Sequence, residues 1–131
     1  MSKRDWLKEL NWSEEHLEEL RTAGYSYIRQ GKYDIALSIF EALSILDPQG
    51  TYDAQILGAL YLELNQPSKA LKHLDKALKL DSHHTPTLLN LTKAFFMLGK
   101  KQEALNLCKI LQNDPAPAVS SMAKALIIAY T

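Results

Sequence analysis

The residues with the clearest chemical potential in this sequence are four histidines and a single cysteine. His83 and His84 are adjacent and lie close to Asp81. Neighbouring side chains point in different directions and make a poor chelate, and no Cys/His set with metal-ligand spacing accompanies them. We therefore expect a solvent-exposed loop pair rather than a metal site. His16 and His73 fall on expected helices, where we predict ordinary surface positions.

The other candidate groups also favour structural over catalytic roles. Cys108 is expected to be a buried thiol, because the sequence places no basic residue to activate it. Carboxylates occur in short runs such as EEHLEE, which are typical of a solvated helix face. The sequence lacks a glycine-rich phosphate loop, a nucleophile elbow and a dinucleotide fingerprint. We predict no catalytic residue, no metal and no cofactor, and hence no enzyme.

Composition narrows the classes of partner. The 131 residues suffice for one compact domain, and fifteen basic side chains balance fifteen acidic ones. Without net charge there is no field to gather nucleic acid or an anionic membrane. The segment MSKRDWLKEL lacks the apolar centre of a signal peptide, and one cysteine fits a reducing compartment. We expect a soluble cytoplasmic protein that binds neither nucleic acid nor membrane.

The elements that carry these residues recur with a fixed period. Ala36, Ala70 and Ala104 lie 34 residues apart. The matching offsets, from twelve before to seven after each alanine, give Gly24, Gly58 and Thr92; Tyr27, Tyr61 and Phe95; Phe40, Leu74 and Cys108; and Leu43, Ala77 and Leu111. Small and large residues that alternate in this way predict paired helices in which a small residue on one helix admits a large one from the other. Each pair leaves an apolar face that the next pair must bury.

Helix-end signals agree with this interpretation. Ser13 can cap a helix that opens with two glutamates, and Pro67 and Pro86 fit first-turn positions. Gly31 and Gly99 are predicted at turns between paired helices. The sequence has no sustained alternation of apolar and polar residues with period two, so we expect no strands.

Two further helices are expected outside the repeats. Residues 3–12 place Trp6, Leu7 and Leu10 on one side of a short helix. Residues 117–130 carry an apolar stripe suited to covering the last repeat, made of Val119, Met122, Leu126 and Ile127.

The repeat resembles the tetratricopeptide family in Gly24, Tyr27, Gly31, Tyr33, Ala36, Phe40 and Pro48 of its first unit. The second unit keeps Leu57, Gly58, Tyr61, Ala70 and Ala77, and the third diverges at Thr92 and Cys108. The resemblance implies an all-α, right-handed superhelix within a single domain. Its parts would be an N-terminal segment (1–16), three repeats (17–50, 51–84 and 85–118) and a capping helix (119–131).

In that family the first helix of each pair lines a concave groove. The corresponding positions here are Arg21, Tyr25 and Ile28, then Gln55, Ala59 and Leu62, then Leu89, Lys93 and Phe96. Most of them are apolar, which favours an extended or helical client segment with spaced hydrophobic anchors. The alternative is that some of them contact the terminal helices instead. An empty apolar groove also leaves weak homodimerisation open.

Family members that grip acidic chaperone tails use a clamp of basic and asparagine side chains. The matching places in this sequence hold Arg21, Tyr25, Ile56, Pro86 and Asn90. Only Arg21 and Asn90 could serve in such a clamp. We therefore do not expect a carboxylate-clamp heat-shock co-chaperone.

The stretch GYSYIRQGKYDIALSIFEALSILDP is similar to the first repeat of the small tetratricopeptide chaperones of bacterial type III secretion. LGALYLELNQPSKAL in the second repeat is also similar. The resemblance implies a virulence-associated cytoplasmic chaperone that holds a translocator or needle subunit before export, with Tyr25, Ile28, Leu62 and Phe96 on the client. The alternative is a generic tetratricopeptide scaffold in a multiprotein complex.

Overall fold

The computed structural model describes residues 5–131, which form α-helices joined by short turns, with no strand in that range. In chain order the helices are α1 (Trp6–Leu10), α2 (Glu14–Arg29), α3 (Tyr33–Leu46), α4 (Thr51–Glu63), α5 (Pro67–Leu80), α6 (Thr85–Met97), α7 (Lys101–Leu111) and α8 (Pro117–Tyr130). Within residues 5–131, no helix combines the length and apolar character that a bilayer crossing requires.

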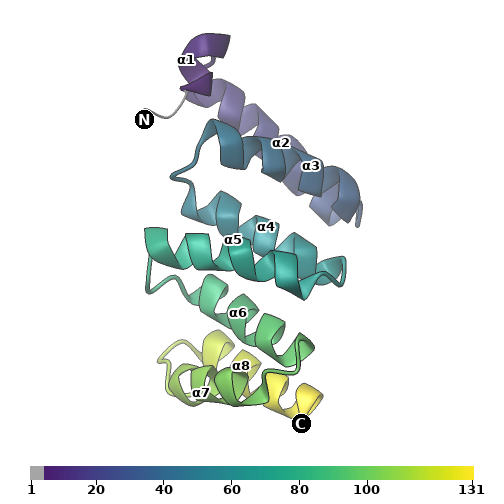
Figure 1. Ribbon diagram of the computed structural model, residues 1–131, viewed down its shortest axis with the longest axis vertical. Helices are drawn as coiled ribbons and strands as arrows, with labels where there is room; N and C mark the ends of the chain where they lie inside the picture. Colours follow the sequence, from purple (N-terminus) through teal and green to yellow (C-terminus); the bar gives the residue numbers. More distant parts are fainter. Residues whose placement is uncertain (1–4) are drawn as a thin grey trace.

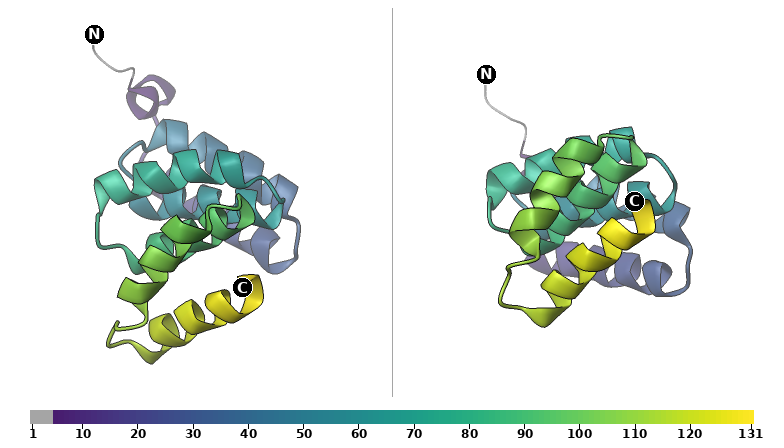
Figure 2. Two further views of the ribbon diagram at one scale, coloured as in Figure 1. Left: turned by 60° about the horizontal axis from the view of Figure 1, so that its bottom comes forward. Right: turned by 90° about the horizontal axis from the view of Figure 1, so that it is seen from below.

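The helices stack as consecutive pairs in two layers (Figure 1). In that view α3, α5 and α7 form the nearer layer, and α2, α4 and α6 form the farther one. α8 packs on both α6 and α7 and lies at the end of the stack opposite to α1 (Figure 2). The predicted arrangement of three helix pairs between a short N-terminal helix and a C-terminal capping helix is confirmed.

The turn inside each pair has the same backbone conformation. Gly31, Asn65 and Gly99 all adopt left-handed φ values, of 74°, 57° and 75°. The next amide in each turn donates to a carbonyl five residues earlier, as Lys32 does to Tyr27 at 2.9 Å and as Gln66 and Lys100 do in the other repeats. This Schellman-type ending stops each first helix and reverses the chain. The turn repeats every 34 residues even though the second repeat lacks glycine there.

Close approach of paired helices explains the small residues of the repeat. A Cβ atom on Gly24 would lie 2.5 Å from the Phe40 ring, and one on Gly58 would lie 2.4 Å from Leu74. The third repeat has Thr92 and Cys108 at these two places, a larger residue on the first helix and a smaller one on the second. Both are fully buried, so the exchange of size keeps the third pair packed.

The N-terminal helix is shorter than predicted. The part of the prediction at residues 3 and 4 lies outside the described residues, and the helix starts after Asp5, whose side chain accepts from the Lys8 amide at 3.1 Å. Asn11 ends it in a left-handed conformation. Leu7 packs on the main core, whereas Leu10 is exposed, so the expected apolar side is only partly buried.

The capping stripe on α8 also differs from the prediction. Leu126 is buried as expected, but Met122 is 51% exposed and the other fully buried contact is Ala123. The small Ala123 lets α8 approach α7, where the Cys108 Sγ atom lies 3.8 Å from the Ala123 carbonyl oxygen. Met122 therefore faces away from α7 and borders a pocket described below.

Candidate functional site

An open pocket of about 550 Å³ lies between α6 and α8. Its lining is mostly apolar and consists of Pro86, Leu89, Asn90 and Lys93 from α6, and Met122, Ala125, Leu126, Ala129 and Tyr130 from α8. Lys93 is the charged side chain of this pocket and makes no ion pair within residues 5–131. An apolar cavity with a few polar groups suits a side-chain anchor that carries a polar neighbour.

A second pocket, of about 370 Å³, lies between α2 and α4. It is lined by Tyr25, Ile28, Tyr33, Ile56, Ala59, Leu60 and Glu63. The Tyr25 ring packs edge-on against the buried Phe40 ring, with 5.6 Å between centroids, and is 37% exposed. Partial burial raises the pKa of Tyr25, so its phenol stays neutral at physiological pH. The pocket thus offers a rigid aromatic surface.

Arg21 occupies a third pocket, of about 320 Å³, next to the second one. Its guanidinium donates to both carboxylate oxygens of the buried Asp53, at 3.0 and 2.9 Å, to Asp47 at 2.8 Å and to Glu18 at 2.7 Å. The hydrogen bond to Asp53 is the main reason that the pKa of Arg21 is raised. Arg21 therefore links α2 to the start of α4, and three carboxylates already surround its single positive charge.

We call the surface lined by these three pockets the groove. Six of the nine predicted groove residues line it: Arg21, Tyr25, Ile28, Ala59, Leu89 and Lys93. Half-buried Gln55 is not among the residues that line these pockets. The groove therefore combines predicted positions from α2, α4 and α6 with a wall from α8 that was not predicted.

Leu62 and Phe96 are not on the groove surface, which corrects the prediction for these two residues. Leu62 is 4% exposed because it packs into the core of the first two repeats. Phe96 is 7% exposed because Tyr130 of α8 stacks on its ring, with 5.1 Å between centroids and 6° between planes. For Phe96 the alternative interpretation, contact with a terminal helix, is correct.

Sequence reasoning missed groove residues that lie outside the repeat offsets. The sequence pattern marks Tyr33 only as a residue of the first repeat and Met122 only as part of the apolar stripe of the capping helix. Both line pockets, together with Glu63 and Tyr130. The available signal was that residues 122, 125 and 129 form a second apolar stripe on α8, beside the one that packs on α7.

The five positions that match a carboxylate clamp are arranged unlike a clamp. Three carboxylates already occupy the Arg21 guanidinium. Ile56 and Pro86 line apolar pockets, and Asn90 lies near Lys93 on α6, in a different pocket from Arg21. No basic cluster faces a single ligand carboxylate in this part of the described chain.

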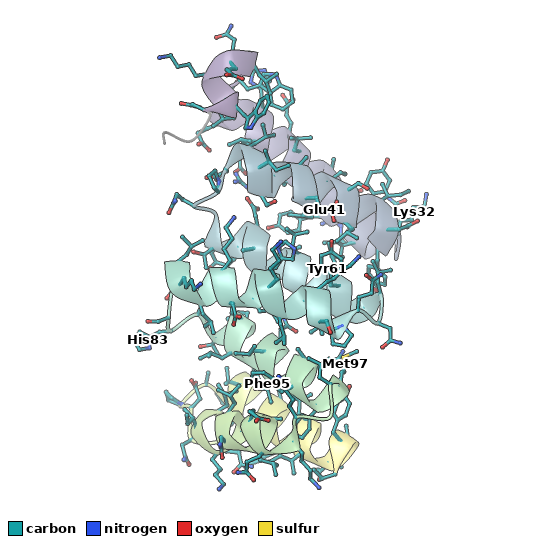
Figure 3. All side chains as sticks on the ribbon, in the orientation of Figure 1. Lys32, Glu41, Tyr61, His83, Phe95 and Met97 are labelled. Carbon is teal, nitrogen blue, oxygen red and sulfur yellow. The ribbon has the colours of Figure 1, made fainter. Side chains whose placement is uncertain are left out.

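Two of the four histidines are more buried than predicted. His84 is 8% exposed rather than solvent-exposed, because its ring packs edge-on against Tyr52 at 4.9 Å and its Nδ1 atom lies 2.7 Å from the Thr87 hydroxyl. His73 is half-buried and stacks on Tyr61 at 5.4 Å. His83 is exposed at the outer edge of the stack, as Figure 3 shows, and His16 caps the start of α2 at an exposed position.

Cys108 is fully buried, as predicted, and burial raises the pKa of its thiol. In the range 5–131, no group of three or more His, Cys, Asp or Glu side chains is arranged to hold a metal ion. The residues that line the groove offer apolar contact, hydrogen bonding and charge.

Comparison with known proteins places these features in a family. The family model described as anaphase-promoting complex, cyclosome, subunit 3 matches residues 29–110, more than half of the chain. Superkiller complex protein 3 of Mus musculus is 30% identical over 77 residues, which cover 59% of this chain. The chain spans only 5% of the length of that relative.

Solved structures show the same superhelical fold. The chain is 26% identical to PcrH in a crystal structure with the chaperone-binding region of PopD, with a TM-score of 0.78 and coverage of 90% of this chain and 92% of that one. SycD, a type III secretion translocator chaperone of Yersinia enterocolitica, is 20% identical, with a TM-score of 0.83 and coverage of 98% and 99%. The predicted all-α superhelix of three helix pairs is confirmed. The chain belongs to the tetratricopeptide-like family described as anaphase-promoting complex, cyclosome, subunit 3, and its fold resembles that of the small chaperones of type III secretion.

Proposed function

We propose that this chain is a bacterial cytoplasmic chaperone that holds a type III translocator or needle subunit before its export. The observation that carries the proposal is the pair of open apolar pockets along the groove, one between α2 and α4 and one between α6 and α8. Similarity to PcrH, whose crystal structure contains the chaperone-binding region of PopD, supports a polypeptide ligand.

The groove would act by burying apolar side chains that otherwise drive aggregation of the client. Each fully buried anchor contributes about 1.5–3 kcal/mol, against the cost of ordering the bound segment. Two anchors then give reversible binding, which suits a protein that must release its client for export. Because the pocket walls belong to packed helices, little of this energy is spent on ordering the chaperone itself.

Co-expression with a candidate translocator or needle subunit tests the proposal. The soluble fraction of the client should rise with the wild-type chain. It should fall again with Leu89→Asp, which places a carboxylate in the α6–α8 pocket. Ile110→Asp is the matched control, because Ile110 is 69% exposed on α7, in the other layer. A client that is equally soluble without the chain would refute the proposal.

A second candidate function is a scaffold within a larger complex, bound through the outer helices. The observation that favours it is the presence of exposed isoleucines on α3 and α7, namely Ile35, Ile45 and Ile110. In that case Ile110→Asp would disrupt the complex and Leu89→Asp would not. The same pair of variants therefore separates the two functions.

A further inference from the structure

We propose that the two apolar pockets of the groove select client segments by charge, with an acidic residue beside the anchor in the α6–α8 pocket and a basic residue beside the anchor in the α2–α4 pocket. This inference rests on the proposed function, because it assumes that the groove binds a polypeptide. The inference adds the charge pattern that the polypeptide carries and the direction in which the polypeptide lies across α2, α4, α6 and α8.

The α6–α8 pocket carries an uncompensated positive charge. Lys93 is half-buried among the apolar residues of the pocket and has no ion-pair partner within residues 5–131. Asn90, one turn earlier on the same helix, adds an amide that can donate a hydrogen bond. An ammonium group at the edge of an apolar cavity favours a ligand carboxylate, and the penalty of partial burial is recovered when the two charges meet.

The α2–α4 pocket has the opposite sign. Glu63 is its charged lining residue, is exposed and makes no ion pair within the described chain. The nearby Arg21 does not offset it, because Glu18, Asp47 and Asp53 together exceed its single positive charge. A basic ligand residue is therefore favoured at this end of the groove, and an acidic one is repelled.

The opposed charges also set a register. The two pockets are separated by at least two helix spacings, which at about 8–10 Å each amount to about 16–20 Å. An extended segment covers about 3.3 Å per residue, so its anchors lie at least about five residues apart. A segment laid across the groove in reverse would bring like charges together at both pockets, which makes the charge pattern an orientation signal.

Selection of random peptides tests this inference without knowledge of the client. Peptides of about twelve residues, roughly twice the required span, are displayed on phage and selected on the immobilised full chain. The variants are Lys93→Glu, Glu63→Lys and the control Lys124→Glu, which makes the same charge change at an exposed α8 position outside the pocket lining. Lys93→Gln serves as the milder variant should Lys93→Glu lose helicity by circular dichroism.

Wild type should enrich acidic residues beside one apolar anchor and basic residues beside another. Lys93→Glu should lose the acidic preference, Glu63→Lys should lose the basic one, and Lys124→Glu should keep both. For one enriched peptide, Lys93→Glu should weaken binding about fivefold in fluorescence anisotropy, the upper range for a solvent-accessible ion pair.

Apolar enrichment without a charge preference, or equal results for Lys93→Glu and Lys124→Glu, would overturn the inference and leave the proposed function standing. No enrichment of any peptide would instead contradict the proposed function. Analytical sedimentation of the free protein measures whether the chain associates with itself. If Lys93→Glu changes self-association and the peptide preference does not change, a second copy of the chain occupies the pocket and the inference is wrong.

Discussion

The Tyr61 hydroxyl donates a hydrogen bond of 2.5 Å to the carboxylate of Glu41, which joins α4 of the second repeat to α3 of the first. Figure 3 shows the two side chains directed toward one another across the gap between these helices. On its other side the Tyr61 ring stacks on His73 of α5. Helices α3, α4 and α5 thus meet at this one aromatic residue.

Loss of this bond should destabilise the stack at neutral pH. We expect Tyr61→Phe to lower the free energy of unfolding by about 0.5–1.5 kcal/mol, because the ring stays packed and only the hydrogen bond is lost. The bond to Glu41 is also the main reason that the pKa of Tyr61 is raised to about 12. Because the folded pKa exceeds the unfolded value near 10, this stabilisation is complete below pH 10 and disappears as the pH rises toward 12. Urea denaturation at both ends of that window, with Tyr52→Phe as the exposed control, should show that Tyr61→Phe loses less stability with pH than wild type.

His73 should make the stack sensitive to acid. Desolvation, assisted by Lys72 and Lys76, lowers the pKa of His73 in the fold. The unfolded chain therefore binds a proton first, and stability falls as the pH drops below about 6.5. Thermal melts at pH 7.5 and pH 5.5 should show a smaller loss for His73→Gln than for wild type. An identical loss in the two proteins would mean that protonation of His73 does not oppose folding.

The Arg21 network should be structural rather than ligand-binding. Asp53 is almost fully buried, so Arg21→Met leaves its carboxylate without a matching charge and should cost about 3–5 kcal/mol. Adding Asp53→Asn should recover part of that cost, because the buried charge is then removed. Glu18→Gln is the control, since Glu18 is largely exposed and its pair with Arg21 should be worth less than about 1 kcal/mol. Denaturant titration of wild type, Arg21→Met, Asp53→Asn and the double variant gives the required double-mutant cycle. Simple additivity of the two single changes would contradict the network.

The left-handed turns should respond to substitution in opposite directions. Asn65→Gly should stabilise the chain by about 0.5–1 kcal/mol, because glycine adopts positive φ without the Cβ penalty. Gly99→Ala should destabilise it by about 1–2 kcal/mol for the same reason, although no atom obstructs the added Cβ. Equal effects of the two changes on the denaturation midpoint would argue against a strained turn in the second repeat.

The periodic features of this fold could be predicted from sequence because each is set by local size or by helix ends. Gly24, Ala36 and Ala70 mark close helix approaches. The turns at Gly31 and Gly99 follow from the glycine that comes just after each first helix. The burial of Phe96 could not be predicted, because it depends on how α8 docks and no repeat offset describes a terminal helix. The inward turn of His84 under Tyr52 likewise depends on contact between two repeats.

The groove could likewise be predicted only where the repeat pattern defines it. The positions on α2, α4 and α6 follow from helical spacing, whereas the contribution of Met122 and Tyr130 follows from the packing of α8 beside α6. The packing of α8 also decides which residues are suitable for testing the groove. Phe96→Ala would open a cavity beneath Tyr130 and damage the fold, whereas Leu89 is only partly buried against the Phe96 cluster and lines the pocket wall.

The most direct measurement of the central claim is site-specific photo-crosslinking in the co-expressed complex. A photoreactive phenylalanine derivative is placed at Leu89, on the wall of the α6–α8 pocket, and separately at Ile110, exposed on α7 in the other layer. If the groove holds the client, the Leu89 probe forms a crosslink to the translocator or needle subunit and the Ile110 probe does not. A crosslink from Ile110 with none from Leu89 would show that the client binds the outer helices, and would contradict the proposed function.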